Sequence, residues 1–182
     1  MKGVIFNAIE ETVRSEQGED AWDDLLDAAG LTGAYTSLGT YPDEQVYALV
    51  DAASSALSLS KEDLLRHLGR RSFGYLAARS PELMTGFRDS RTVLLSLNAV
   101  IHPEVRKIYP GADVPVFEVA TETGGQLSLS YQSKRGLCHY AEGLAHGAAD
   151  HFGETLEVSQ PRCQHRGAPD CELLITWADP RR

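Results

Sequence analysis

Three side chains in the second half of the sequence have the types and the spacing needed to bind carboxylates. Tyr131, Ser133 and Arg135 alternate with other residues at the end of a predicted strand. Side chains two residues apart in an extended chain project from the same face, so these three would form one row. Arginine grips a carboxylate through two parallel hydrogen bonds, and hydroxyls satisfy the remaining lone pairs. Arg135 also precedes a predicted helix, where a cation is unfavourable unless it binds an anion.

His102 supplies a second chemical group, an imidazole that can coordinate a metal. It lies in a predicted helix over residues 91–109, and its spacing from Leu94, Leu95 and Asn98 would place all four on one interior face. A lone histidine on an apolar face is more often a structural core residue than a ligand. The row of two hydroxyls and a guanidinium nearby favours the interpretation of His102 as a ligand. An imidazole for iron and a row for two flexible carboxylates together fit haem, with its propionates on the row.

The bulk composition of the 182-residue chain favours a soluble globular protein. Hydrophobic residues make up 42% of it, enough for a core, and its net charge of -9 would repel the phosphates of nucleic acid. Glu10 and Glu11 follow the N-terminus too closely for a signal peptide, and no apolar run could span a bilayer. We therefore expect a cytoplasmic monomer that binds neither nucleic acid nor a membrane.

Hydrophobic periodicity predicts helices through the first two thirds of the chain and strands thereafter. Helices are expected over residues 3–14, 18–30, 42–53, 60–77 and 91–109, with a short piece near 83–87. Pro103 should bend the helix over 91–109. Strands are expected over residues 116–119, 126–131, 155–158 and 171–177, around a helix over 136–152 and with a turn at 124–125. This order predicts an α+β fold, in which an N-terminal helical lobe precedes a lobe of helices packed on a small four-stranded antiparallel sheet.

Taken in order, several of these residues resemble the H-NOX family, the haem-nitric oxide/oxygen binding domains related to the haem domain of soluble guanylate cyclase. The resemblance covers essentially the whole chain. A lone Y-x-S-x-R motif is a weak signal, but the full set in this order is specific. The set comprises Met1-x-Gly3, His102, KIYPG at residues 107–111, Pro115 and Tyr131-x-Ser133-x-Arg135.

For this sequence the resemblance implies a haem b cofactor and a role for five residues. His102 would be the proximal ligand of the iron. Tyr131, Ser133 and Arg135 would bind the propionates. Pro115 would press on the porphyrin, which is unusually distorted in this family.

The resemblance also implies which residues face a bound gas. Tyr140 matches a tyrosine of oxygen-binding members, whose hydroxyl can donate a hydrogen bond worth about 1–2 kcal/mol to O2 in a dry pocket. Leu144 follows on the same stripe, and Ile5 would line the same distal pocket. Ile9 and Ser72 match positions where oxygen binders carry the tryptophan and asparagine that hold the tyrosine, so O2 affinity should be modest. Alternatively, Tyr140 is a core aromatic whose hydroxyl points elsewhere.

The cysteines form a further candidate site, because they match three ligands of a structural zinc found in some bacterial family members. These are Cys138, Cys163 and Cys171. The family's fourth ligand, a histidine, is replaced by Gln160. His165 is the expected substitute, whereas His139 is expected to point away. The alternative is a set of buried or redox-active free thiols.

Together these inferences predict a sensor of NO that also binds CO and O2, and not an enzyme. The resemblance implies one domain over residues 1–182, with residues 1–60 as a mobile distal lobe and 61–182 as the proximal and β-containing lobe. A separate partner, such as a histidine kinase or a cyclic-di-GMP enzyme, would read the lobe movement. The alternatives are a haem enzyme acting on NO or peroxide and a haem-free zinc-stapled regulatory domain, which would leave the 131–135 row unexplained.

Overall fold

The computed structural model describes residues 1–123 and 125–178. The first part of the chain is helical: α1 (Gly3–Gln17), α2 (Ala21–Ala29), α3 (Asp43–Leu57), α4 (Lys61–Arg79), α5 (Pro81–Met84), α6 (Ser90–Leu95), η1 (Leu97–Ile101) and α7 (His102–Ile108). The second part is β1 (Val116–Thr123), β2 (Gln126–Gln132), α8 (Cys138–Phe152), β3 (Leu156–Ser159), η2 (Gln164–Arg166) and β4 (Cys171–Trp177). The predicted α+β fold is confirmed.

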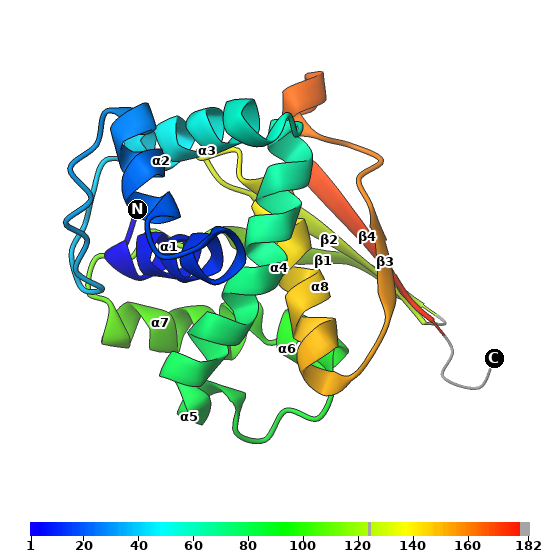
Figure 1. Cartoon of the computed structure of the whole chain (residues 1–182). Helices are drawn as coiled ribbons and strands as arrows, with labels where there is room; N and C mark the ends of the chain where they lie inside the picture. Colours follow the sequence, from blue (N-terminus) through cyan, green and yellow to red (C-terminus); the bar gives the residue numbers. More distant parts are fainter. Residues whose placement is uncertain (124, 179–182) are drawn as a thin grey trace.

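The four strands form one antiparallel sheet in the order β1-β2-β4-β3. Alternate side chains of β2 and β4 are fully buried against α6 and α8, as expected for a sheet with one covered face. The predicted turn at 124–125 includes residue 124, which lies outside the described residues. Figure 1 shows α4 and α8 between the N-terminal helices and the sheet.

The helical lobe forms around its own core. Phe6, Trp22, Leu49 and Leu68 are among the buried side chains that α1 to α4 contribute to it. Ser60 caps the start of α4, because its hydroxyl accepts a hydrogen bond of 3.1 Å from the Asp63 amide. None of the helices in the described ranges is long and apolar enough to cross a membrane.

Helices α4 and α8 approach each other closely because glycines stand at their crossing. A Cβ atom on Gly69 would lie 2.2 Å from the carbonyl oxygen of Tyr140, and one on Gly143 would lie 2.1 Å from that of Arg66. Neither distance is compatible with a side chain. The two backbones therefore touch, and the pair forms a rigid support for whatever side chains α8 presents.

The single bent helix predicted over residues 91–109 is wrong. The chain forms α6, then the π-helical turn η1, then α7, with Pro103 in the first turn of α7. Pro103 has no N–H to donate to a preceding carbonyl, and the Ile101 and His102 amides bond five residues back, to Ser96 and Leu97. The predicted shared face also fails, because Asn98 is exposed while His102 is buried.

Candidate functional site

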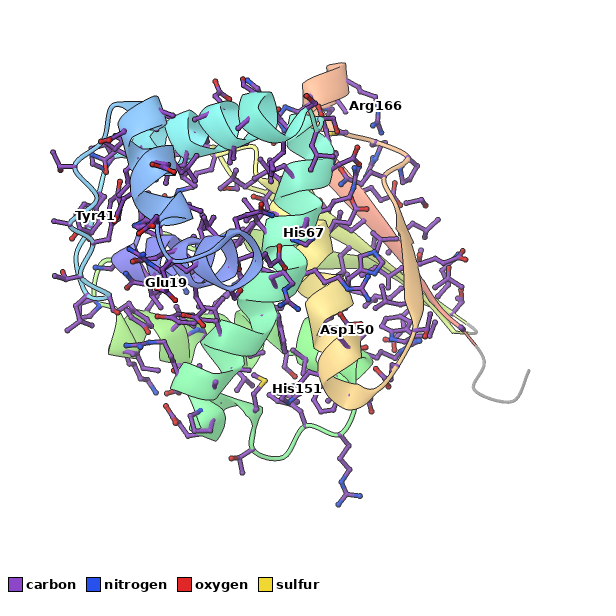
Figure 2. The ribbon with its side chains drawn as sticks, viewed as in Figure 1. Glu19, Tyr41, His67, Asp150, His151 and Arg166 are labelled. Carbon is purple, nitrogen blue, oxygen red and sulfur yellow. The ribbon has the colours of Figure 1, made fainter. Side chains whose placement is uncertain are left out.

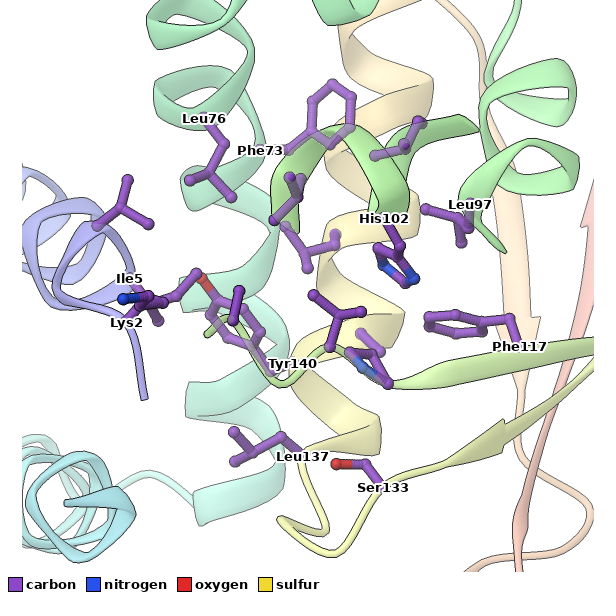
Figure 3. A pocket seen from close by; sticks show the side chains of 18 of the residues that line it. Lys2, Ile5, Phe73, Leu76, Leu97, His102, Phe117, Ser133, Leu137 and Tyr140 are labelled. Atoms are coloured by element: carbon purple, nitrogen blue, oxygen red, sulfur yellow. The ribbon is translucent and has the colours of Figure 1, made fainter. Parts of the chain in front are cut away.

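A cavity of about 300 Å³ lies between the N-terminal helices, α4 to α8 and the sheet. Most of its lining is aliphatic or aromatic, supplied by α1, α4, α5, α6, η1, α7, α8 and three strands. His102 and Tyr140 extend into it from separate elements, with apolar side chains between them (Figure 3). This volume is at the lower end of the 300–1,000 Å³ typical of small-molecule sites, roughly the size needed for a cofactor.

His102 is a buried imidazole with an unused nitrogen. Its side chain lines the cavity, and its Nδ1 atom is buried with no hydrogen-bond partner among the described residues. Burial, followed by the charge of Arg106, lowers the pKa of His102 to about 4. The ring is therefore neutral near pH 7, which is the form that coordinates a metal.

The wide turn η1 and strand β1 hold the surroundings of His102. Phe117 on β1 packs against the imidazole, with ring centroids 5.9 Å apart. Asn98 on η1 binds the backbone of Phe117 twice: it accepts a 3.2 Å hydrogen bond from the amide and donates one to the carbonyl. Sequence reasoning gave Asn98 the wrong face, but the side chain still positions the aromatic wall beside the histidine.

Tyr131, Ser133 and Arg135 all line the cavity, as predicted from their spacing. Alternation along a strand explains the position of Tyr131 only. Strand β2 ends at Gln132, and Ser133 and Arg135 lie in the turn before α8. Burial raises the pKa of Tyr131 to about 12, and the nearby Ser133 hydroxyl offsets part of that rise. Tyr131 thus remains a hydrogen-bond donor at all ordinary pH values.

Arg135 already has anionic partners within the chain. Its Nε lies 2.9 Å from a carboxylate oxygen of Asp43 on α3, and its Nη2 lies 3.2 Å from Asp113. Asp113 also accepts at its backbone carbonyl, 2.6 Å from Nη1. The expectation that only a bound ligand would balance this cation is therefore wrong. Asp43 in turn accepts a 2.6 Å hydrogen bond from the N-terminal amine of Met1.

Pro115 lines the cavity from the segment between α7 and β1. Sequence reasoning did not anticipate several other contributors, including Asp113 in the same segment and Met84 on α5. Their positions depend on the tertiary fold, and neither belongs to a motif with recognisable chemistry. Asp113 could have been found only by asking which acid balances Arg135.

Most of the residues expected to face a gas do line the cavity: Ile5, Tyr140 and Leu144. Tyr140 is buried, and its hydroxyl has no hydrogen-bond partner among the described residues. Burial raises the pKa of Tyr140 to about 12, and the nearby Ser72 hydroxyl offsets part of the rise. Ser72 is fully buried and does not itself line the cavity.

The assignment of Ile9 to this pocket is wrong. Its side chain is buried in the helical lobe and lines a separate, smaller cavity. On α1 the face that points to the larger cavity carries Val4 and Ile5, whereas Ile9, one turn later, meets α3 and α4. The helical register was right, but the depth at which α1 passes the cavity could not be read from the sequence.

The three cysteines come together in a buried cluster beside Tyr131. The sulfur of Cys163 lies 3.7 Å from that of Cys138 and 3.8 Å from that of Cys171. Burial raises the pKa of the Cys138 and Cys171 thiols. Without a bound cation they are therefore neutral thiols, and the cluster's charge state depends on what it binds.

The histidine nearest the cysteines is not the expected one. A ring nitrogen of His139 lies within 4.8 Å of the Cys138 and Cys163 sulfurs, whereas Nε2 of His165 donates to the Gly136 carbonyl at 2.6 Å. The prediction that His139 points elsewhere is thus wrong. Gln160, which stands where the family has a histidine, lies 3.0 Å from Nδ1 of His139.

Comparison with known proteins indicates the same class of protein as the geometry of the larger cavity, namely a haem-binding domain. A family model described as haem-NO-binding matches residues 2–160. A crystal structure of an H-NOX protein from S. oneidensis in the Fe(II)NO state is 32% identical, with a TM-score of 0.93 over 98% of this chain and 100% of that one. The unliganded Fe(II) H-NOX protein from K. algicida is 29% identical, with a TM-score of 0.89 over 100% of this chain and 99% of that one.

A curated relative is the soluble guanylate cyclase gcy-34 of Caenorhabditis elegans, 28% identical over 159 residues. The match covers 79% of this chain but only 22% of that protein. The chain therefore corresponds to a small part of the cyclase.

The fold and the cavity define a haem-based gas-sensor domain of the H-NOX type, which is not a catalytic class. Because the family model covers most of its length, the chain belongs to the haem-NO-binding family. The residues present fit the cofactor that this family binds. The cavity offers a neutral imidazole whose Nδ1 has no hydrogen-bond partner in the described part of the chain, an apolar interior, and a group of two hydroxyls and a guanidinium.

Proposed function

We propose that this chain senses nitric oxide through haem b held in the larger cavity. His102 coordinates the iron, while Tyr131, Ser133 and Arg135 bind the propionates and Pro115 contacts the porphyrin. The bound haem supplies a ferrous iron that takes up neutral diatomic gases, so we expect CO to bind as well.

One observation carries this proposal: the imidazole of His102 lines the apolar cavity in its neutral form, and its Nδ1 makes no hydrogen bond to the described residues. A buried polar group left unpaired costs about 1–3 kcal/mol, so an imidazole in these surroundings favours a ligand in the cavity. The neutral ring and the apolar lining both favour a metal carried by a hydrophobic group. At the other end, Arg135 would exchange or share its contacts with Asp43 and Asp113 when carboxylates arrive.

Tyr140 provides the hydrogen-bond donor on the gas side of the cavity. Its hydroxyl is buried and unpaired in the described part of the chain, and its raised pKa keeps the proton on the oxygen. O2 accumulates negative charge on binding and gains from such a donor, whereas NO needs it far less. We therefore propose tight NO binding and modest O2 binding.

The signal leaves the domain through a change in the relation of its two lobes. We propose that residues 1–60 shift against residues 61–182 when the gas is bound, as a population shift between two arrangements. Arg135 is placed to take part, because its ion pairs join Asp43 of one lobe to Asp113 of the other. A histidine kinase or a cyclic-di-GMP enzyme is the proposed partner. In the C. elegans relative the matching region is 22% of a guanylate cyclase, which supports coupling to a signalling enzyme.

A structural zinc is proposed for the cysteine cluster. Zn–S bonds of about 2.3 Å at tetrahedral angles separate two sulfurs by about 3.8 Å, close to both measured distances. The ligands would be Cys138, Cys163 and Cys171, with His139 favoured over His165 as the fourth. A redox-active thiol cluster is the alternative for the same residues.

Visible spectra of the purified ferrous protein with and without NO test the main proposal. We expect a Soret band that moves when NO is added. A protein without a visible band, despite ample haem during expression, would favour the haem-free regulatory domain. Sustained consumption of NO or peroxide would favour the enzyme.

Metal analysis of the purified protein tests the zinc proposal separately. We expect about one zinc per chain in the wild type and in His165→Ala, and less in His139→Ala. Equal zinc loss in His165→Ala would reverse the assignment of the fourth ligand.

A further inference from the structure

The loop between β3 and β4 reaches over to the turn that carries Ser133 and Arg135. On its short helix η2, His165 donates a hydrogen bond of 2.6 Å from Nε2 to the backbone carbonyl of Gly136. Gly136 follows Arg135 in the turn between β2 and α8, and it lies 29 residues before His165. Figure 2 labels Arg166, the neighbour of His165 on η2. The imidazole thus joins a distant loop to the turn that holds two of the proposed propionate ligands.

This contact depends on the glycine at position 136. Its φ of +60° lies in the left-handed region that favours glycine. A Cβ atom at this position would lie 3.1 Å from Cε1 and 3.4 Å from Nε2 of His165. Because Gly136 has no side chain, the imidazole can lie directly against its backbone.

The imidazole of His165 is held on a second side, and the loop beneath it is tied together. The ring of His139 lies nearly parallel to it, at an angle of 16° with the ring centroids 5.7 Å apart. The Arg166 and Ala168 amides both donate to the Cys163 carbonyl, at 2.9 and 3.2 Å, and so fix η2. His165 is exposed and does not line the larger cavity, so it acts on the turn from outside.

Two consecutive carbonyls in this turn accept hydrogen bonds from side chains of distant segments. Tyr47 on α3 donates to the Arg135 carbonyl at 3.0 Å, and His165 donates to the Gly136 carbonyl. The turn's own hydrogen bond, from the Gly136 amide to the Ser133 carbonyl, is long at 3.4 Å. The backbone position of Arg135 therefore depends on donors from outside the turn.

The Ser133 hydroxyl depends on the same backbone. Its Oγ accepts a hydrogen bond of 3.2 Å from the Arg135 amide. A shift of the backbone at residues 135–136 would therefore move both the guanidinium and the hydroxyl that are proposed to meet the propionates.

We propose that His165 is a positioning residue for the haem propionates. Its hydrogen bond to Gly136 holds the backbone in the place from which Ser133 and Arg135 meet the two carboxylates. Groups that are held in place before a ligand arrives lose less conformational entropy when it binds, so this contact strengthens haem retention. The inference rests on the haem binding proposed for the larger cavity, and it adds a loop outside that cavity which controls how firmly the cofactor is held.

Transfer of haem from the loaded protein to an excess of apomyoglobin measures this role. His165→Ala should release haem about 2–10-fold faster than the wild type, the range that one intramolecular hydrogen bond gives. His165→Gln can still donate from its side-chain amide and should recover most of the wild-type rate. The matched control is Gln164→Ala, which removes a 3.1 Å hydrogen bond to Pro169 within the same loop and leaves the contact with Gly136 in place. The control should release haem at the wild-type rate.

Resonance Raman spectra of the ferrous protein separate positioning from a general loss of stability. In His165→Ala the propionate bending bands should shift, whereas the iron–histidine stretching band should keep its wild-type frequency. Both sets of bands should match the wild type in His165→Gln and in Gln164→Ala. The zinc content of the same samples should also be unchanged.

Unshifted propionate bands and wild-type haem release in His165→Ala would overturn the proposal. Equal acceleration in Gln164→Ala, or no recovery in His165→Gln, would also overturn it, because the effect would then come from the loop in general and not from its hydrogen bond to the turn. Loss of zinc in His165→Ala would assign the change to metal binding and contradict the positioning role. A wild-type protein that takes up no haem would instead overturn the proposed function, and this role of His165 with it.

Discussion

The two walls of the larger cavity are built differently. The wall that carries Tyr140 consists of α4 and α8, 19 and 15 residues long, whose backbones touch at glycines. The wall that carries His102 consists of three short segments of six, five and seven residues. Within α7, His102 is the one buried residue. We infer that the histidine wall yields when the ligand changes, whereas the tyrosine wall stays fixed, because local stability follows buried contact.

Removing the histidine should have the largest effect. In His102→Gly the haem content after purification should fall by at least about tenfold, since a lost ligand should cost no less than the 10–100-fold of a lost outer partner. Adding imidazole should restore the pigment, because the ring then enters as a free ligand. The control is His151→Ala, an exposed histidine on α8. Haem retention equal to that of the control would show that His102 does not hold the cofactor, and the histidine wall would then have no special role.

A methyl group at the glycine crossing should break the fixed wall. Gly143→Ala places a Cβ 2.1 Å from the Arg66 carbonyl oxygen, and the forced separation should lower the free energy of unfolding by about 2–3 kcal/mol. Urea denaturation measures it. Gly74→Ala on α4 is the matched control, because a Cβ there meets nothing within 4 Å, and it should stabilise by up to about 1 kcal/mol. Similar values for the two variants would show that the backbones can move apart freely.

The tyrosine hydroxyl sharpens the comparison without disturbing the wall. Tyr140→Phe keeps the ring and removes a buried hydroxyl that has no partner within residues 1–123 and 125–178, so stability should change little. O2 affinity should fall by about 5–30-fold, the equivalent of a hydrogen bond of about 1–2 kcal/mol, while NO affinity is retained. Stopped-flow O2 dissociation measures this change. An unaltered dissociation rate would return Tyr140 to the role of a core aromatic.

Asp43 tests the connection between the helical lobe and the turn that carries Arg135. Partial burial opposes its ionisation, but hydrogen bonds from the N-terminal amine and Arg135 outweigh this and hold the pKa of Asp43 below its usual 3.8. Its contribution to stability is therefore present above about pH 3.8 and is lost as the pH falls below that value. Asp43→Asn should destabilise by about 1 kcal/mol at pH 7 and by progressively less in acid.

The control for Asp43 is Asp27→Asn, an exposed residue of α2. Urea unfolding at a series of pH values measures both variants. A cost at pH 7 that persists unchanged below pH 3 would mean that the ionised carboxylate is not the stabilising group.

The sequence was sufficient for features that depend on local spacing. The order of elements follows from periodicity. Tyr131, Ser133 and Arg135 all line one cavity, but strand alternation accounts only for Tyr131, because the other two lie in the turn after β2. Burial of His102 was also predicted, but through a continuous helix that does not exist. The π turn shifts the phase of the helix, so His102 is buried although Asn98, four residues earlier, is exposed.

The features that were missed depend on contacts between distant segments. The acids beside Arg135 come from α3 and from the segment before β1, both more than 20 residues earlier in the chain. His139 was misjudged because adjacent residues on a helix point about 100° apart, yet the loop carrying Cys163 closes over both Cys138 and His139. Ile9 was misplaced by one turn for the same reason. The spacing of residues predicts which face of a helix they share, but not which part of that face lies beside the cavity.

The π turn before His102 makes the direction of its imidazole a matter of hydrogen-bond pattern. The turn holds one residue more than an α-helical turn and absorbs it, because the Ile101 and His102 amides bond five residues back. The same residues in ordinary α-helix would rotate the imidazole by one further residue, about 100° around the axis. Every reactive side chain would remain in the sequence, but the imidazole would no longer point in its present direction. The wide turn itself, more than the composition of the segment, is what the protein has to keep.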